Sequence, residues 1–245
     1  MESKQPIIEI NNLHKTFGDN HVLSGVNIAV NKSEDVVILG RSGTGKSVTI
    51  KCLVGLEKAD QGEIKVFGTD ITQLKSNELN EIRTRIGFMF QNGALYDSMS
   101  VRQNLTFTLK HHDKTISSEE IETRITEALD NVGLLEAIDK MPSALSGGMR
   151  KRIGMARTLI IKPEIILYDE PTSGLDTITA REISELMVSV QKKFKTTSLI
   201  ITHDMACAKL TGDRIMILKD GVINAEGTYA ELEQSKDPWV KSFFI

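Results

Sequence analysis

The sequence predicts an α/β fold with a mostly parallel β-sheet core, an antiparallel β subdomain and an inserted α-helical subdomain. The first observation is a set of short apolar runs that end in polar or glycine residues, which is typical of strands buried on both faces of a parallel sheet. These runs are DVVILG at 35–40, RIGFMF at 85–90, EIILYDE at 164–170, TSLIITHD at 197–204 and DRIMILKDG at 213–221. The second observation is that helical patterns alternate with these strands, as in a doubly wound core, at about 46–55, 177–194 and 204–211.

The antiparallel subdomain is predicted from a different β pattern. Short β-like runs at 7–13, 21–30 and 62–68 are divided by Gly, Asn and Asp, which favour turns between neighbouring strands. We therefore expect these runs to form a separate layer near the start of the chain.

The helical subdomain is predicted between RIGFMF and EIILYDE, where about seventy residues carry no strand signal. Segments 100–109, 117–133 and 147–160 each have helical periodicity. Ser117 and Glu120 have the spacing of a capping box, and Gly133 stands where a C-terminal cap is expected. With no internal repeat or low-complexity linker, we expect one domain over 1–245 with a helical subdomain at approximately 92–160.

Composition excludes several classes of protein. The net charge of −3 over 245 residues provides no broad basic field, so nucleic acid is not an expected partner. The two cysteines, Cys52 and Cys207, fit ordinary buried thiols in a reducing compartment. We find no secretory signal and no apolar run near the ~20 residues of a membrane span. Any role at a membrane is therefore expected to come through another subunit.

The strongest motif is GRSGTGKS at 40–47, which follows a predicted buried strand and opens a predicted helix. This is the context of a P-loop, in which glycines let successive backbone amides point at phosphate oxygens. Lys46 is expected along the β- and γ-phosphates and Ser47 at Mg²⁺. The expected nucleotide contacts of the loop are Gly40, Arg41, Ser42, Gly43, Thr44, Gly45, Lys46 and Ser47.

Polar residues end three other predicted core strands. Asp169 and Glu170 close EIILYDE, where Asp169 is expected to steady Mg²⁺ and Glu170 to orient or deprotonate the attacking water. His203 follows LIIT and could contact a γ-phosphate, although a structural turn residue is the alternative. Gln91 follows RIGFMF, and its amide could contact Mg²⁺ or the water. Phe17 could stack on an adenine ring, whereas the residue taken alone favours a core or turn aromatic.

A second glycine stretch, LSGG at 145–148, precedes the helical pattern at 147–160. Ser146, Gly147 and Gly148 offer a hydroxyl, bare amides and a helix N-terminus, which is the chemistry for holding a γ-phosphate. One nucleotide's phosphates are already enclosed by 40–47. We therefore infer that this stretch serves a nucleotide held by another chain; the alternative is a plain helix cap.

The ordered set GRSGTGKS, Gln91, LSGGM, YDEP, SGLD and His203 resembles the ATP-binding subunit of ABC transporters over almost the whole chain. The resemblance implies ATP hydrolysis with Mg²⁺ in a head-to-tail homodimer, where the P-loop of one subunit and the LSGG serine of the other enclose each ATP. It also implies that Phe17 stacks on adenine, that Glu170 is the catalytic base assisted by His203, Gln91 and Lys46, and that the segment ending at Asp176 crosses the dimer interface.

FMFQNGALYDSMSVRQNL, LYDEPTSGLDTITA and DPWVKSFF further resemble the ATPases of Mla/Mce-type lipid transporters. That resemblance implies phospholipid or other lipid as cargo and an integral-membrane permease that meets residues after Gln91. It also implies Mce-type and small regulatory subunits, and a peripheral place on the cytoplasmic face of the inner membrane. Thr177 replaces a proline common in that subgroup, and Phe17 replaces a tyrosine. The alternative function is a soluble ABC-type ATPase that scaffolds complex or cofactor assembly.

Overall fold

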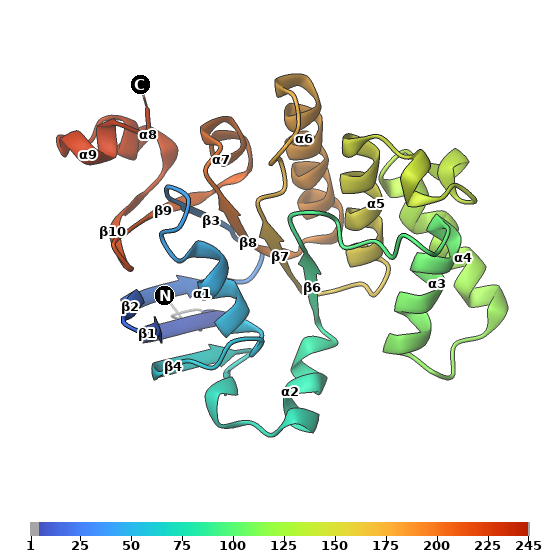
Figure 1. The fold of residues 1–245 in the computed structure, drawn as a ribbon, viewed down its shortest axis with the longest axis horizontal. Helices are drawn as coiled ribbons and strands as arrows, with labels where there is room; N and C mark the ends of the chain where they lie inside the picture. Colours follow the sequence, from blue (N-terminus) through green and yellow to red (C-terminus); the bar gives the residue numbers. More distant parts are fainter. Residues whose placement is uncertain (1–4, 245) are drawn as a thin grey trace.

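In the computed structural model, which describes residues 5–244, the chain forms two β-sheets with helices around the larger one (Figure 1). The larger sheet has the strand order β10-β9-β3-β8-β7-β6, and its neighbouring pairs are parallel apart from the antiparallel pair β9 and β10. Its strands are β3 (Asp35–Leu39), β6 (Ile86–Met89), β7 (Ile165–Asp169), β8 (Thr197–Thr202), β9 (Arg214–Lys219) and β10 (Val222–Gly227). The predicted α/β fold with a mostly parallel core is confirmed.

The smaller sheet is antiparallel, in the order β2-β1-β4-β5. It consists of β1 (Ile8–Phe17), β2 (Asn20–Val30), β4 (Gln61–Val66) and β5 (Thr69–Asp70). Helix α1 (Lys46–Leu53) packs between the two sheets, and its Ile50 and Leu53 are buried with apolar residues from both. This layer positions Phe17 at the end of β1, near the loop that opens α1.

Most of the remaining helices cover the other face and one end of the core sheet, whereas α2 packs on the apolar cluster that faces the antiparallel sheet (Figure 1). Helix α5 packs against α4 and α6, and Figure 1 places α3, α4 and α5 together at one end of the molecule. These helices are α2 (Ser76–Arg83), α3 (Val101–His112), α4 (Ser118–Asn131), α5 (Gly147–Leu159), α6 (Thr177–Phe194) and α7 (Met205–Thr211), followed near the C-terminus by α8 (Tyr229–Glu233) and α9 (Pro238–Lys241).

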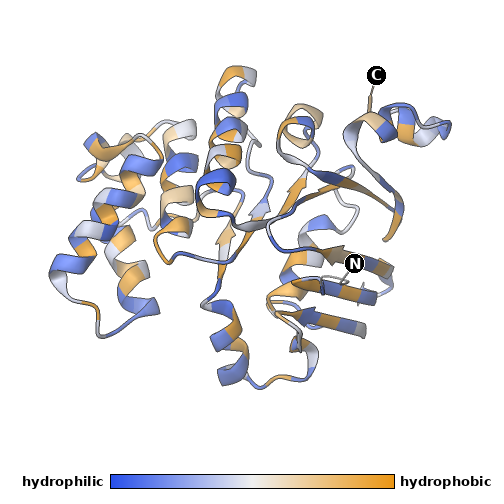
Figure 2. Ribbon diagram, turned by 180° about the vertical axis from the view of Figure 1, so that it is seen from behind, coloured by the Kyte–Doolittle hydropathy of each residue, from blue (hydrophilic) through white to orange (hydrophobic). Residues whose placement is uncertain are grey.

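The apolar core divides at the parallel sheet because alternate strand residues point to opposite faces. In β3, Val36 and Ile38 join the cluster that faces the antiparallel sheet, whereas Val37 and Leu39 join the cluster beneath the helices. In Figure 2 orange predominates in the central strands, apart from their polar ends, and the surrounding helices alternate in colour. Both faces of the sheet are therefore covered, so a ligand site is expected at the carboxyl ends of the strands.

Local expectations from the sequence are met in most places. The Ser117 hydroxyl accepts a hydrogen bond from the Glu120 amide at the start of α4, but the Glu120 carboxylate accepts from Arg124 and does not complete a capping box. Gly133 ends the helix with φ of 66°, in the left-handed region that glycine adopts readily. Both cysteines are buried free thiols. Within residues 5–244, no helix has the length and apolarity needed to cross a membrane.

Candidate functional site

The loop 40–47 connects the buried strand β3 to helix α1. Gly43 and Gly45 have φ of 81° and 100°, and a Cβ at Gly45 would lie 2.8 Å from the Val22 carbonyl oxygen. Only glycine therefore fits this turn without displacing β2. The Lys46 side chain is 5% exposed, and its ammonium donates hydrogen bonds to the carbonyls of Gly40 at 2.7 Å and Arg41 at 3.1 Å. The loop is thus folded around its own lysine.

Asp169 and Ser47 meet at the carboxyl edge of the sheet. The Ser47 hydroxyl donates a 2.8 Å hydrogen bond to the Asp169 carboxylate, which comes from the last residue of β7. Burial raises the pKa of Asp169, and the hydrogen bond from Ser47 opposes that rise. Carboxylate and hydroxyl oxygens are hard donors that suit Mg²⁺. The described residues hold no group of three or more His, Cys, Asp or Glu around a common metal position. Two oxygen donors beside a phosphate loop nevertheless fit Mg²⁺, which takes few protein ligands and completes its shell with phosphate and water.

Glu170 follows directly and is held from two sides. One carboxylate oxygen lies 3.4 Å from the Lys46 ammonium, and the other shares a 2.7 Å hydrogen bond with the His203 ring nitrogen Nδ1. The His203 amide also donates to that oxygen at 3.3 Å. Glu170 is only 12% exposed at its side chain, whereas His203 is 55% exposed. A carboxylate oriented in this way can accept a proton from a water molecule placed beside Lys46.

The phosphate loop, Glu170 and His203 open into one cavity of about 410 Å³, and Asp169 lies behind Ser47 without lining it. Phe17 at the end of β1 and Gln91 just beyond β6 line it together with the phosphate loop, Glu170 and His203. The full lining is Phe17, Val22, Ser42, Gly43, Gly45, Lys46, Ser47, Val48, Gln91, Glu170 and His203. Residues far apart in the sequence are thus brought together, and the exposed Phe17 ring leaves a face free for a flat ligand.

The second glycine stretch does not line this cavity. Ser146 is the N-cap of α5, and its hydroxyl accepts a hydrogen bond from the Met149 amide at 3.2 Å. A Cβ at Gly148 would lie 2.6 Å from the Thr179 methyl carbon, so α5 and α6 approach closely at this point. Asp176 caps α6 by accepting from the amides of Ile178 and Thr179, and the Thr179 hydroxyl bond lowers its pKa.

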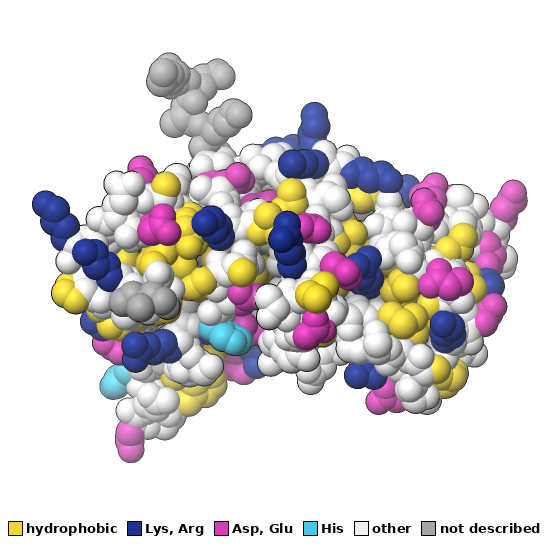
Figure 3. All heavy atoms as spheres, turned by 90° about the horizontal axis from the view of Figure 1, so that it is seen from above, with side chains coloured by type: hydrophobic (Ala, Val, Ile, Leu, Met, Phe, Trp, Pro, Cys, Tyr) yellow, Lys and Arg dark blue, Asp and Glu magenta, His cyan; other side chains and the backbone are white. Residues whose placement is uncertain are grey.

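Asp176 and Ser146 therefore lie outside the chain's own cavity, on a face that also carries a larger cavity of about 950 Å³ beside Ser173 and Leu175. Figure 3 views the molecule from above and shows hydrophobic side chains interspersed with acidic and basic ones on this face. No single sign of charge dominates the part of the face that the picture describes.

One residue beside the site escaped the sequence reasoning. Lys151 on α5 is 5% exposed, and its ammonium donates to the carbonyls of Gln91 and Glu170 and to the Ser173 hydroxyl. Burial lowers its pKa to about 8. A helical-wheel count offered a signal, because Lys151 lies three and four positions before Gly154 and Met155, which are both buried. Its neighbour Arg152 points away from the site and pairs with Glu182 at 2.9 Å.

A family profile described as ABC transporter matches residues 23–173, about three fifths of the chain. The chain belongs to the ABC transporter family. It is 41% identical over 236 residues to the probable ribonucleotide transport ATP-binding protein Mkl of Mycobacterium tuberculosis, covering 96% of this chain and 66% of that protein. It is 39% identical over 254 residues to the protein trigalactosyldiacylglycerol 3, chloroplastic, of Arabidopsis thaliana, covering 97% of this chain and 73% of that one. The chain thus spans about two thirds of the length of these relatives.

A solved ABC structure has the same fold. The dimeric post-hydrolysis state of an ATP-binding cassette bound to ADP and Pi aligns with a TM-score of 0.82 and 32% identity, over 90% of this chain and 98% of that one. The resemblance to ATP-binding subunits of ABC transporters that the sequence predicted is confirmed.

Proposed function

We propose that this chain is the ATP-hydrolysing subunit of a membrane transporter that moves phospholipid or another lipid across the cell envelope. The observation that carries the ATPase role is the single cavity in which the phosphate loop, Gln91, Glu170 and His203 meet. Lipid as cargo is supported by the relative named for a galactolipid and by the Mla/Mce-like segments. The relative named for ribonucleotide transport leaves a nucleotide cargo as the competing assignment.

ATP would lie with its adenine on Phe17 and its phosphates in the loop 40–47. The loop amides and the Lys46 ammonium would hold the β- and γ-phosphates, since Lys46 is already fixed by two loop carbonyls. Ser47 and Asp169, with the Gln91 amide, would hold Mg²⁺, which when bound neutralises developing charge on the phosphates.

Glu170 would be the general base. Its carboxylate would accept the proton of the attacking water, and the hydrogen bond from His203 keeps the carboxylate aimed along the cavity wall. In the present geometry one Glu170 oxygen lies 3.4 Å from Lys46, so a bound γ-phosphate would compete with Glu170 for that ammonium. Binding of ATP would thereby release Glu170 toward the water.

The homodimer completes the proposed site. Ser146, Gly147, Gly148 and Asp176 lie outside the chain's own cavity, so a head-to-tail partner is required if they are to reach a nucleotide. The similar cassette bound to ADP and Pi is dimeric, which supports this arrangement. The signature serine of each protomer would then close over the ATP in the P-loop of its partner.

The proposed permease surface follows Gln91. Tyr96 and Phe107 are exposed and in edge-to-face contact at 5.1 Å between ring centroids. A separate apolar recess of about 170 Å³, lined by Leu56 and Phe88 among others, lies at the strand that leads to Gln91, and Leu56 is 55% exposed. Apolar surface of this kind beside a nucleotide site supports docking of a membrane subunit on the inner face of the membrane. A soluble scaffold partner is the alternative.

The experiment is purification of the tagged full-length chain from native membranes in mild detergent, followed by mass spectrometry of proteins and extracted lipids. We expect a polytopic permease and stoichiometric phospholipid or sterol. Tyr96→Asp should lose both, while the control Phe194→Asp, at the C-terminal end of α6 and exposed to a similar degree, should retain both. A soluble partner without a permease would favour the scaffold, and a permease with bound ribonucleotide and no lipid would overturn the lipid assignment.

A further inference from the structure

Lys151 is a buried cation whose hydrogen-bonding capacity is fully used. Its three N–H groups match three acceptors: the Gln91 carbonyl, the Glu170 carbonyl at 3.0 Å and the Ser173 hydroxyl at 3.4 Å. In the described part of the chain no carboxylate forms an ion pair with it. Burying an ammonium among neutral oxygens alone costs desolvation free energy, and a lysine on the protein surface would not incur that cost. Its contacts therefore point to a function in the site.

The three acceptors come from three separate segments. Gln91 lies just beyond β6, Glu170 just beyond β7, and Ser173 in the loop that leads to α6, while Lys151 itself is on α5. Gln91 and Glu170 both line the nucleotide cavity. One side chain on the helix that begins at Ser146 thus joins the two residues expected to touch the water and the metal.

The Glu170 backbone explains why such a link matters. Glu170 has φ of 49°, a left-handed conformation that a residue with a side chain adopts only when its surroundings hold it there. Its carbonyl accepts from the Ser173 amide at 3.2 Å, the Ser173 hydroxyl at 2.9 Å and the Lys151 ammonium. Lys151 therefore helps to fix the backbone from which the carboxylate is aimed.

Further contacts pack the loop after Gln91 tightly against α5. Gly154 on α5 faces Gly93 so closely that a Cβ on Gly154 would lie 2.9 Å from the Gly93 Cα. One turn on, the Arg157 guanidinium donates to the Ala94 carbonyl. These contacts follow the loop along α5, but only Lys151 also reaches Glu170.

We propose that Lys151 is a positioning residue for ATP hydrolysis, which holds the Gln91 loop and the backbone of Glu170 in one fixed arrangement with α5. It acts through Glu170 and touches no nucleotide, because it does not line the cavity. The proposal rests on the assignment of Glu170 as the base, and the experiment separates the two.

The test compares Lys151→Met and Lys151→Gln with wild type in the full-length chain, measuring kcat for ATP, the Kd of a fluorescent ATP analogue, and the melting temperature. Removing a charged hydrogen bond that acts only on the hydrolysis geometry should lower kcat about ten- to hundred-fold while Kd stays within about threefold. Lys151→Gln keeps two N–H donors and should lose less activity than Lys151→Met. The exposed Lys114→Met is the matched control and should behave as wild type.

A double-mutant cycle with Ser173→Ala adds a second readout, since Ser173 shares the Glu170 carbonyl with Lys151. The combined loss in kcat should be smaller than the product of the single losses. Wild-type kcat in both Lys151 variants, or a parallel loss of kcat, ATP binding and melting temperature in both, would overturn the positioning role. If instead Glu170→Gln hydrolyses ATP at the wild-type rate, the base assignment itself is wrong.

Discussion

Asp35, the first residue of β3, is a buried carboxyl with an incomplete set of partners. Its Oδ1 atom has no hydrogen-bond partner, while its amide donates to the Asp213 carboxylate at 2.9 Å. Burial raises the pKa of Asp35 to about 7, with a hydrogen bond from Ser198 opposing the rise and the Asp213 and Glu34 carboxylates adding to it. A protonated Asp35 can satisfy its own site better than a charged one.

This makes the stability of the fold depend on pH in a defined direction. The folded state binds a proton that the unfolded state lacks between pH about 4 and 7, so the unfolding free energy falls as pH rises through that window. Asp35→Asn removes the titration, and its stability relative to wild type should increase by about 2 to 3 kcal/mol between pH 5 and pH 8. Urea unfolding at both pH values measures this, with the exposed Asp130→Asn as control. An equal difference at both pH values would show that Asp35 is already ionised at pH 5 in the folded state, which would contradict the raised pKa.

Residue types at strand ends made most of the candidate site predictable. Gln91, Glu170 and His203 were expected together because parallel strands end at one edge, and they do line one cavity. The helical periodicity could have indicated that Lys151 is buried, but not its place in the site, because its contacts are backbone carbonyls of distant segments and carbonyls carry no sequence signal. The left-handed backbone of Glu170 was invisible for the same reason.

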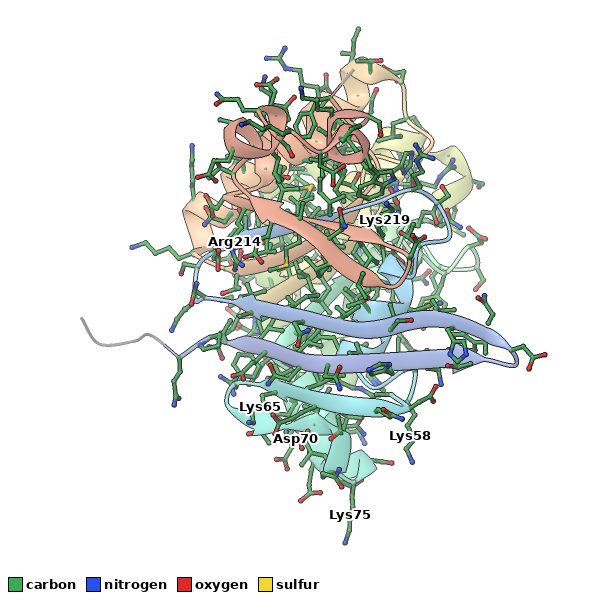
Figure 4. All side chains as sticks on the ribbon, turned by 90° about the vertical axis from the view of Figure 1, so that its left-hand side faces the viewer. Lys58, Lys65, Asp70, Lys75, Arg214 and Lys219 are labelled. Carbon is green, nitrogen blue, oxygen red and sulfur yellow. The ribbon has the colours of Figure 1, made fainter. Side chains whose placement is uncertain are left out.

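At the scale of elements, Arg214 joins the two sheets. From the start of β9 its guanidinium donates to both oxygens of Glu34, at 2.7 and 3.1 Å, and also to Glu226 on β10 and to the Ala29 carbonyl on β2. Figure 4 labels Arg214 where β9 passes over the antiparallel sheet. The hydrogen bonds with Glu34 raise the pKa of Arg214 further, so the charge is permanent.

Arg214→Met should therefore destabilise the fold by about 1 to 3 kcal/mol, because it leaves the half-buried Glu34 without its bidentate partner. Arg214→Lys should recover only part of the loss, since an ammonium cannot form the planar pair. The exposed ion pair between Arg181 and Glu185 on α6 offers the control. Arg181→Met should lower the unfolding free energy by less than about 0.5 kcal/mol. Denaturant titration of the three variants measures the order; equal losses for Arg214→Met and Arg181→Met would contradict the inter-sheet role.

Strongly patterned elements were predictable from the sequence, whereas half-exposed ones were not. Helix α6 begins and ends as predicted at 177–194, because its apolar stripe is long and Asp176 caps it. Helix α2 was missed, since none of its residues is buried and only Leu79 and Ile82 pack on the core. Strand β10 was missed as well, because its residues are at best half-buried and it is held to β9 by backbone bonds.

At the scale of the whole molecule, the proposed role in transport would require ATP to shift a dimer between an open and a closed state. Moving that equilibrium from about 1:99 to 99:1 needs ~5.5 kcal/mol of differential affinity, shared by two sites. Charge-assisted hydrogen bonds contribute about 1.5 to 3 kcal/mol each, so two γ-phosphate contacts per site from Ser146 and its neighbouring amides suffice. Loss of the γ-phosphate would remove those contacts, and the proposed dimer would reopen.

Mixing two inactive chains tests whether each nucleotide is enclosed by two protomers. Lys46→Ala disables the P-loop and Ser146→Arg blocks the signature helix start, so each variant alone should be inactive while Ser146→Arg still binds ATP. In a mixed dimer both defects fall in one site, and the other pairs an intact loop with an intact serine. An equimolar mixture should therefore recover about one quarter of wild-type hydrolysis, measured by phosphate release. Lys46→Ala mixed with Glu170→Gln is the control. Lys46 and Glu170 lie on the same side of the nucleotide, so in this mixed dimer each of the two sites carries one defect and neither is active. If the first mixture is no more active than its components, each site is completed within one chain.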